Sequence, residues 1–190
     1  MNPIILIIVA AVVLLPAVYV LVQYNALVAL RNYIRESWSD VDVELKRRYD
    51  LIPNLVAVVK GYAAHERGVL ERVAELRNRC AANNGPVADQ SRDEIQLVDA
   101  LKQLLAVVEN YPQLKANQDF LKLQTELVNT EDRIQAARRF YNGNVRDYRN
   151  KCETFPSNLV ANIFGFKSEG DFFSVPPSVR DVPNVDFATA

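Results

Sequence analysis

The only histidine of the chain, His65, is followed directly by Glu66, and this pair is the first candidate for chemistry. A neutral imidazole can bind a metal ion or move a proton, and a carboxylate beside it can orient it. A metal site also needs further ligands at suitable spacing, and neither Cys80 nor Cys152 lies near His65 in the sequence. We therefore interpret His65 as a residue on the surface or in the interior of a helical bundle. A metal-binding or general-base role is the alternative.

The rest of the sequence contains none of the common catalytic motifs. It has no P-loop, no Gly-x-Ser-x-Gly, no His-Glu-x-x-His and no dinucleotide-binding glycine pattern. The carboxylates Glu126, Glu131 and Asp132 lack the Glu-x-x-His partners of a di-iron bundle. We predict a protein that is not an enzyme and that has no catalytic residue, no metal and no cofactor.

Composition narrows the class of protein further. The 190 residues suffice for one domain with a real core, and 49% of them are hydrophobic. Lys and Arg number 22 against 23 Asp and Glu, so no basic field indicates a nucleic-acid partner.

The elements that must hold these residues begin with an apolar run. Residues 3–23 carry no charge and are about as long as a helix that crosses a bilayer, so we predict a transmembrane helix over 1–23. The positive-inside rule places the N-terminus outside and the rest in the cytoplasm, because cations follow the run and none precedes it: Arg31, Arg35, Lys46, Arg47 and Arg48. Cys80 and Cys152 would then be free, buried thiols in a reducing compartment.

Apolar residues recur at three-four spacing through the remainder, in four stripes. The pattern predicts an all-α protein in which the transmembrane helix continues into an antiparallel, up-and-down bundle of about four long helices, over residues 24–166. Loops are expected at 81–90, where Asn, Gly and Pro gather, and near Tyr111 and Pro112. Ser91 and Glu94 form a capping box that would open the third helix. Residues 167–190 are expected to be an extended tail.

Lys46, Arg47 and Arg48 precede Asp50 and Pro53 at the expected end of the first helix after the membrane. A corner explains this order, because cations stabilise the C-terminal end of one helix, Asp50 caps the next and Pro53 fits its first turn. The functional alternative is a basic knob at the membrane-distal tip that binds an acidic partner.

Several long segments resemble the LemA family of bacterial membrane proteins: YNALVALRN (24–32), WSDVDVELKRRYDLIPNLVAVVKGYAAHE (38–66), AVVENYPQLKANQDFLKLQTELVNTEDRIQAARRFYN (106–142) and FPSNLVANIFGF (155–166). The resemblance covers residues 24 to about 173. It implies a short external N-terminus, one span of the inner membrane and an internal helical bundle. It carries no catalytic residues, and it suggests membrane organisation, with one relative at magnetosome membranes, or an adaptor role beside membrane proteases or envelope stress.

Polar residues lie in or beside the apolar stripes, which a simple bundle does not require. We expect Asn54, Glu131, Arg133 and Arg138 to form a buried or inter-subunit hydrogen-bond network that fixes register. Parallel spans align copies of the chain, so we predict a homo-oligomer that scaffolds the bilayer, with a monomer as the alternative. A cytoplasm-facing adaptor for another membrane protein or protease, bound through Lys46, Arg47 and Arg48, is the second functional hypothesis.

The C-terminal aromatic residues offer a last candidate surface: Phe155, Phe164, Phe166, Phe172 and Phe173. By up-and-down topology the fourth helix returns toward the bilayer and ends before Pro156. These rings would then lie at the membrane surface, or they would fold back to close the bundle or contact a neighbouring subunit. The sequence leaves these alternatives open.

Overall fold

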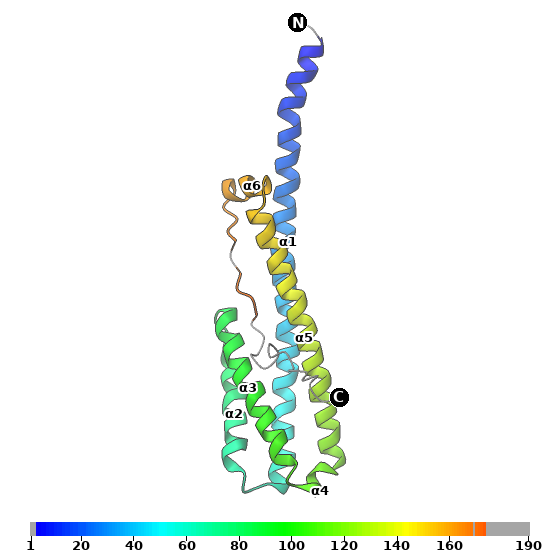
Figure 1. The fold of residues 1–190 in the computed structure, drawn as a ribbon, viewed down its shortest axis with the longest axis vertical. Coiled ribbons are helices and arrows are strands. Elements are labelled where there is room, and N and C mark those ends of the chain that lie inside the picture. Colours follow the sequence, from blue (N-terminus) through cyan, green and yellow to red (C-terminus); the bar gives the residue numbers. More distant parts are fainter. Residues whose placement is uncertain (1–2, 169, 174–190) are drawn as a thin grey trace, which may run out of the picture. The chain divides into compact units, whose positions relative to one another are not determined.

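The structure is a computed structural model that describes residues 3–168 and 170–173. These residues form six helices and no strand: α1 (Pro3–Tyr62), α2 (Arg67–Ala82), α3 (Val87–Val108), α4 (Pro112–Lys115), α5 (Gln118–Glu153) and α6 (Ser157–Ile163) (Figure 1). The all-α prediction is confirmed. The expected tail beyond residue 173 lies outside the described residues.

The chain divides into two compact units, and α1 and α5 each contribute to both. Among the described residues, unit 1 comprises 3–41, 137–168 and 170, and unit 2 comprises 42–136 and 171–173. The division between the units falls within the two long helices.

The apolar run forms the first turns of α1. Its large side chains are mostly exposed, as Leu15 at 70% and Val12 at 67% show. Among the described residues, α1 is the one helix long and apolar enough to cross a membrane. Because these side chains have little protein to pack against, lipid is the environment that suits them.

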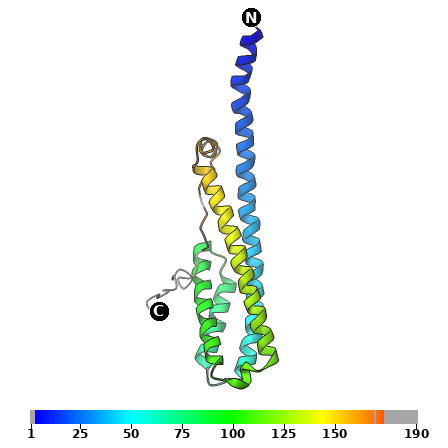
Figure 2. The ribbon, with the colours of Figure 1, turned by 45° about the vertical axis from the view of Figure 1, so that its right-hand side comes forward.

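Unit 2 is the four-helix bundle. The last turns of α1, the first turns of α5, and all of α2 and α3 pack around buried side chains that include Leu55, Leu76, Leu104 and Phe120 (Figures 1 and 2). Short connections join α1 to α2 and α2 to α3, and α4 lies between α3 and α5. Short connections make neighbouring helices antiparallel, as the sequence pattern predicts.

The predicted corner at residues 45–53 is wrong, because α1 runs without a break to Tyr62. Pro53 has no N–H, so the carbonyl of Tyr49 lacks its donor within the helix. Arg77 of α2 supplies the missing donor, with its Nε 2.9 Å from that carbonyl oxygen. The helix therefore continues past a proline that would otherwise favour its end.

Two other helix boundaries differ from the sequence pattern. The chain turns at residues 63–66, where no loop was expected. The apolar stripe keeps its phase across this turn, because Val59, Ala63 and Leu70 are all buried. The capping box is also wrong. α3 begins at Val87, after Pro86, and Ser91 and Glu94 are buried about one and two turns inside it.

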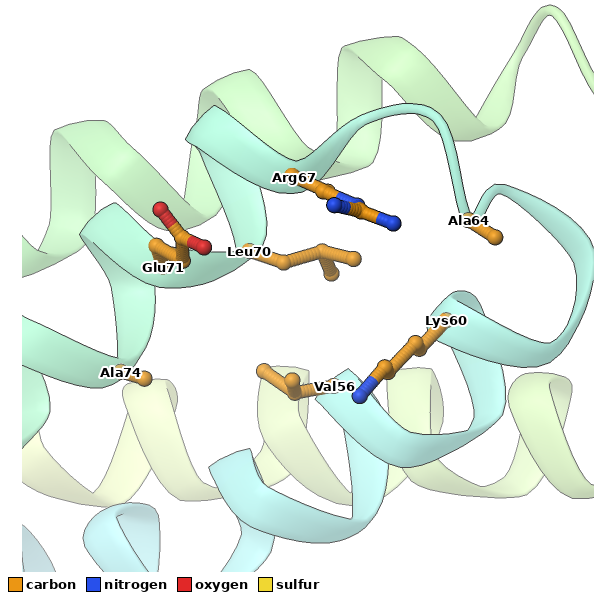
Figure 3. Close-up of a pocket in the computed structure, with 7 residues that line it drawn as sticks. All are labelled: Val56, Lys60, Ala64, Arg67, Leu70, Glu71 and Ala74. Atoms are coloured by element: carbon orange, nitrogen blue, oxygen red, sulfur yellow. The ribbon is translucent and has the colours of Figure 1, made fainter.

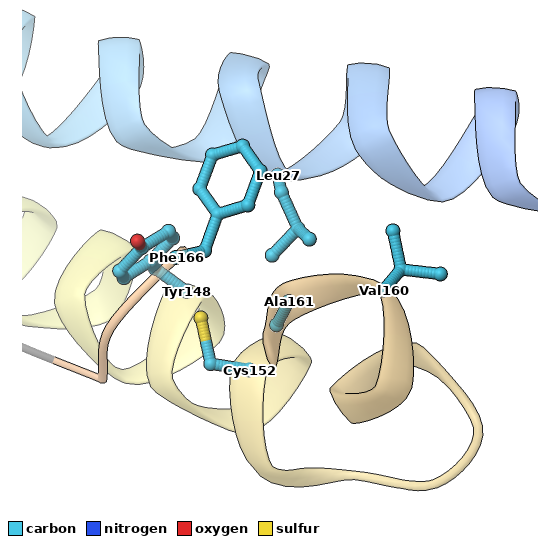
Figure 4. Packing of buried hydrophobic residues seen from close by; sticks show 6 residues of the cluster. All are labelled: Leu27, Tyr148, Cys152, Val160, Ala161 and Phe166. Carbon is cyan, nitrogen blue, oxygen red and sulfur yellow. The ribbon is translucent and has the colours of Figure 1, made fainter. Parts of the chain in front are cut away.

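Unit 1 joins α1, α5 and α6 around a second apolar core. Figure 4 shows Leu27 of α1 facing Cys152 of α5, Ala161 of α6 and the ring of Phe166. Gly165 has φ +71°, the left-handed conformation that suits the residue after a helix. The Phe166 N–H then bonds to the Ala161 carbonyl at 2.8 Å, which closes α6 and turns Phe166 onto α1.

Candidate functional site

A buried network of charges lies at the centre of unit 2. The Arg48 side chain, fully buried on α1, forms ion pairs with Glu94 of α3 and, at 2.8 Å, with Glu131 of α5. The hydroxyl of Tyr49 donates a hydrogen bond to the Glu94 carboxylate. The network therefore ties three of the four helices of the bundle together.

The composition and burial of the network indicate a structural role. Transfer of Arg48 and Glu94 from water costs several kcal/mol per ion, and their attraction offsets this only with good pairing. Glu131 keeps 29% of its side chain exposed, so the network has one edge that water can reach. Its charges are satisfied only when the three helices are in register, which favours one arrangement of the bundle over slipped ones.

The structure brings together few of the residues proposed from the sequence. Arg48 and Glu131 meet, whereas Lys46, Asn54 and Arg133 are exposed in unit 2. Arg47 is exposed and pairs with Glu44, one turn earlier on α1, at 3.0 Å. Arg138 is buried, but in unit 1.

His65 lies exposed in the turn between α1 and α2. Within the described residues, no group of three or more His, Cys, Asp or Glu side chains is placed to hold a metal ion. Glu66 accepts a hydrogen bond from the Tyr111 hydroxyl at 3.2 Å, and partial burial and this bond raise the pKa of Tyr111. His65 and Glu66 therefore do not act together: His65 is exposed, and Glu66 binds Tyr111 in the loop before α4.

A shallow pocket of about 400 Å³ lies beside this turn, between the end of α1 and the start of α2. Figure 3 shows Lys60 and Arg67 on opposite sides of its mouth, with Glu71 further along α2. Val56 and Leu70 contribute aliphatic side chains to its lining. Because it has no convergent set of polar groups and no residue suited to nucleophilic attack, it suggests no chemistry.

The aromatic residues at the C-terminal end separate into two groups. Phe166 and Phe173 are buried, whereas three stay exposed: Phe155 at 74%, Phe164 at 49% and Phe172 at 40%. Ile163 of α6 is also 74% exposed. α6 packs beside the end of the apolar run, where a groove of about 600 Å³ is lined by residues of α1, by Pro156 and by residues of α6: Leu15, Pro16, Tyr19, Val20, Pro156, Leu159, Val160 and Ile163. The cluster therefore both closes a core and leaves an apolar surface.

Both cysteines are free and buried, as predicted. Burial raises the pKa of Cys80 from 9.0 to about 11, although nearby Arg48 opposes the shift. Burial also raises the pKa of Cys152, and a hydrogen bond with Tyr148 offsets part of that change. Neither thiol has the lowered pKa of a reactive cysteine.

Sequence reasoning missed Glu94 and Arg77. The capping-box pattern assigns Glu94 to a helix end, although it lies three residues before Leu97 on the stripe that α3 buries. Arg77 had no signal of its own. The sequence signal that could have been used is Pro53. A proline inside a helix leaves the carbonyl four residues earlier without its N–H donor, so a donor from elsewhere is expected.

Comparison with known proteins gives one family and a few relatives. The model of the LemA family matches residues 37–187. The magnetosome proteins MamQ 1 and MamQ 2 of Paramagnetospirillum magneticum are each 26% identical over 183 residues, which covers 83% of this chain and 67% of theirs. Protein LemA of Metamycoplasma hominis is 30% identical over 139 residues, which covers 72% of this chain and 63% of that protein. The chain spans about two thirds of the length of the relatives that it matches.

Proposed function

The chain belongs to the LemA family, and we propose that it is a non-enzymatic membrane protein that associates laterally with copies of itself and so organises the membrane around it. The apolar run of α1 and the membrane-associated character of its relatives give the coarser part of this statement, a helical protein located in a membrane. Self-association and scaffolding are the parts to be tested.

One observation carries the proposal. Outside the apolar run, α5 exposes Leu121 at 44% and Val128 at 55%, although most of its other exposed residues are polar. Seven residues are about two turns, so both side chains lie on the same face of α5. Copies held in one bilayer share an orientation and a high effective concentration, so a narrow apolar contact suffices to join them.

The relatives support the same class of function. Two of them are named as magnetosome proteins, and a role in organising a membrane needs no catalytic chemistry from this chain. We propose the bacterial inner membrane, with the N-terminus outside and the two units in the cytoplasm. Reporter fusions at the C-terminus test this orientation, since a fluorescent protein matures in the cytoplasm and a periplasmic phosphatase does not.

The adaptor hypothesis relied on a knob formed by the three cations Lys46, Arg47 and Arg48. Arg48 is buried and paired, and Arg47 pairs with Glu44, so no knob of three free cations exists in the described residues. Lys46 and Arg47 remain exposed on one helix, which is a small surface for an acidic partner.

Cross-linking in native membranes tests self-association. Val128→Cys should give dimers with a short bis-maleimide, whereas the exposed neighbour Asn129→Cys, about 100° away around α5, should give few. The native thiols are buried and contribute little background. Equal cross-linking at both positions, or none at either, would contradict an interface on this face.

Mass measurement in mild detergent gives an independent test. Leu121→Glu with Val128→Glu should reduce the mass found by light scattering from an oligomer to a monomer. Gln118→Glu with Asn129→Glu adds the same charge at exposed polar positions of α5 and should leave the oligomer intact. A wild-type protein that is monomeric at every concentration would rule the scaffold out.

A further inference from the structure

Unit 1 contains a cationic pocket close to the end of the apolar run. Arg31 and Arg35 of α1 and Lys167, from the segment after α6, line a recess of about 450 Å³. Its other lining residues are Ile34, Tyr148, Gly165 and Phe166, so none of the described residues around the recess is acidic. Three positive charges around one hollow are the pattern of an anion-binding site.

The two arginines of the pocket differ from the other arginines of α1 in their partners. In the described part of the chain, neither Arg31 nor Arg35 has a carboxylate within ion-pair distance, whereas Arg47 and Arg48 both do. The guanidinium of Arg31 instead lies over the ring of Phe166, with Cζ 5.4 Å from the ring centroid. This contact holds Arg31 in place and leaves its N–H groups available to an anion.

The third cation is positioned by the local fold. Gly165, with its positive φ, ends α6 and directs Phe166 into the core of unit 1 (Figure 4). On the other side of Lys167, the hydroxyl of Ser168 donates to Glu153 at 2.6 Å, and Arg149 donates to the carbonyl of Gly170 at 2.6 Å. Lys167 is thus held next to α1 by contacts on both sides.

The position of the pocket along α1 fits the polar layer of a bilayer. Arg31 is eight residues beyond Gln23, or about 12 Å by helical rise, and the headgroup layer is roughly 5–8 Å thick. Side chains of a helix lean toward its N-terminus, so Arg31 and Arg35 point back toward the membrane. The charged end of Arg31 therefore approaches the level of lipid phosphates, and Arg35 lies about one turn further from the bilayer, about 18 Å beyond Gln23 by helical rise.

An apolar surface continues from the pocket toward the membrane. Phe164 is 49% exposed, and its ring packs against Tyr24 of α1, with centroids 5.0 Å apart. Beyond Tyr24 lie Val20 and the groove that α1 forms with α6. A molecule with an anionic head in the pocket and an acyl chain along this surface would match both parts.

We propose that Arg31, Arg35 and Lys167 form a binding site for the phosphate group of an anionic phospholipid in the leaflet on the C-terminal side of the span. The site fixes the depth of α1 in the membrane and selects lipids around the protein. It does not depend on self-association, because all of its residues belong to one chain and lie apart from Leu121 and Val128 in the sequence.

Lipid binding is measured on the full-length protein in mild non-ionic detergent, by native mass spectrometry during titration with short-chain phosphatidylglycerol. Phosphatidylglycerol should bind at one saturable site, and phosphatidylcholine should not compete for it. Each cation near lipid phosphate strengthens binding about fivefold, so Lys167→Gln should weaken it by roughly that factor. Arg31→Gln with Arg35→Gln and Lys167→Gln should abolish saturable binding.

A matched control removes the same charges elsewhere. Lys122→Gln with Arg133→Gln and Arg139→Gln replaces exposed cations of α5 and should leave affinity unchanged. Equal loss in the control, or unchanged binding in the pocket variants, would overturn the site. Lys167→Gln keeps the proposal testable if the triple variant misfolds, since Lys167 is exposed.

Competition with inorganic phosphate shows whether the anion in the pocket is a lipid phosphate or a soluble phosphate compound. The lipid proposal expects millimolar phosphate to leave phosphatidylglycerol bound, because phosphate lacks the acyl chain. Complete displacement by phosphate at that concentration would identify the pocket as a site for a soluble phosphate compound and would overturn the lipid assignment.

Discussion

The Nε of Arg77 donates a hydrogen bond of 2.9 Å to the carbonyl of Tyr49, which is the carbonyl that Pro53 leaves without a donor in α1. One side chain of α2 thus supplies the backbone hydrogen bond that α1 lacks at Pro53, and it joins the two helices. We call this interaction the Arg77 repair. The same arginine lies 3.9 Å from the Asp50 carboxylate, an exposed contact that contributes little.

A double-mutant cycle tests this repair. Arg77→Leu should lower the free energy of unfolding by about 1–3 kcal/mol, because a carbonyl in a buried residue loses its partner. In Pro53→Ala the new amide supplies that partner, so Arg77→Leu should cost at least about 0.5 kcal/mol less there. Asp50→Asn controls for the ion pair and should change little. Unfolding of the full-length protein in mild detergent, followed by circular dichroism, gives these values, and strict additivity would refute the repair.

The buried network predicts a different pattern. Arg48→Met should lower the free energy of unfolding by about 3–5 kcal/mol, because the Glu94 charge stays buried without its cation. Glu94→Leu added to Arg48→Met removes both charges and should recover part of this loss. Arg47→Met, next to it and exposed, should change stability by less than about 0.5 kcal/mol. Chemical denaturation measures all three. An Arg48→Met protein as stable as wild type would show that the charges do not hold the bundle.

Cys80 predicts a loss of stability at alkaline pH. Its pKa is about 11 in the folded protein and near 9.0 when unfolded, so the unfolded state releases its proton first as pH rises. The contribution of Cys80 is complete below about pH 9 and is lost as pH rises toward 11. The stability difference between wild type and Cys80→Ala should therefore shrink between about pH 9 and about pH 11. A difference independent of pH would mean that the thiol is not desolvated in the folded protein.

The exposed side of α6 predicts contact with lipid. A fluorophore on Ile163→Cys should be quenched by brominated lipids in reconstituted vesicles, because Ile163 is exposed beside the end of the apolar run. The same label on Leu121→Cys, in unit 2, should be quenched much less. Quenching at neither position would indicate that α6 lies against another protein surface.

The sequence by itself determined the class of the protein. An uncharged run of about 21 residues is long and apolar enough to cross a bilayer, and three-four spacing of apolar residues requires helices that bury one face. The candidate span and the all-α bundle therefore follow from local pattern. The burial of Cys80 and Cys152 follows in the same way. Each of these features depends on residues close together in the chain.

Only the tertiary structure decided where helices end and which charges meet. The order of Arg48, Asp50 and Pro53 favours a corner locally, but Arg77, 24 residues after Pro53, supplies the missing hydrogen bond and α1 continues. The local pattern around Glu94 is that of a capping box, and only the fold places Arg48 beside it as a buried ion-pair partner. Arg31, Arg35 and Lys167 share a pocket only because α6 turns the chain back onto α1. Such outcomes depend on partners distant in sequence, whose free energy of interaction exceeds the local preference of about 1 kcal/mol for a cap or a turn.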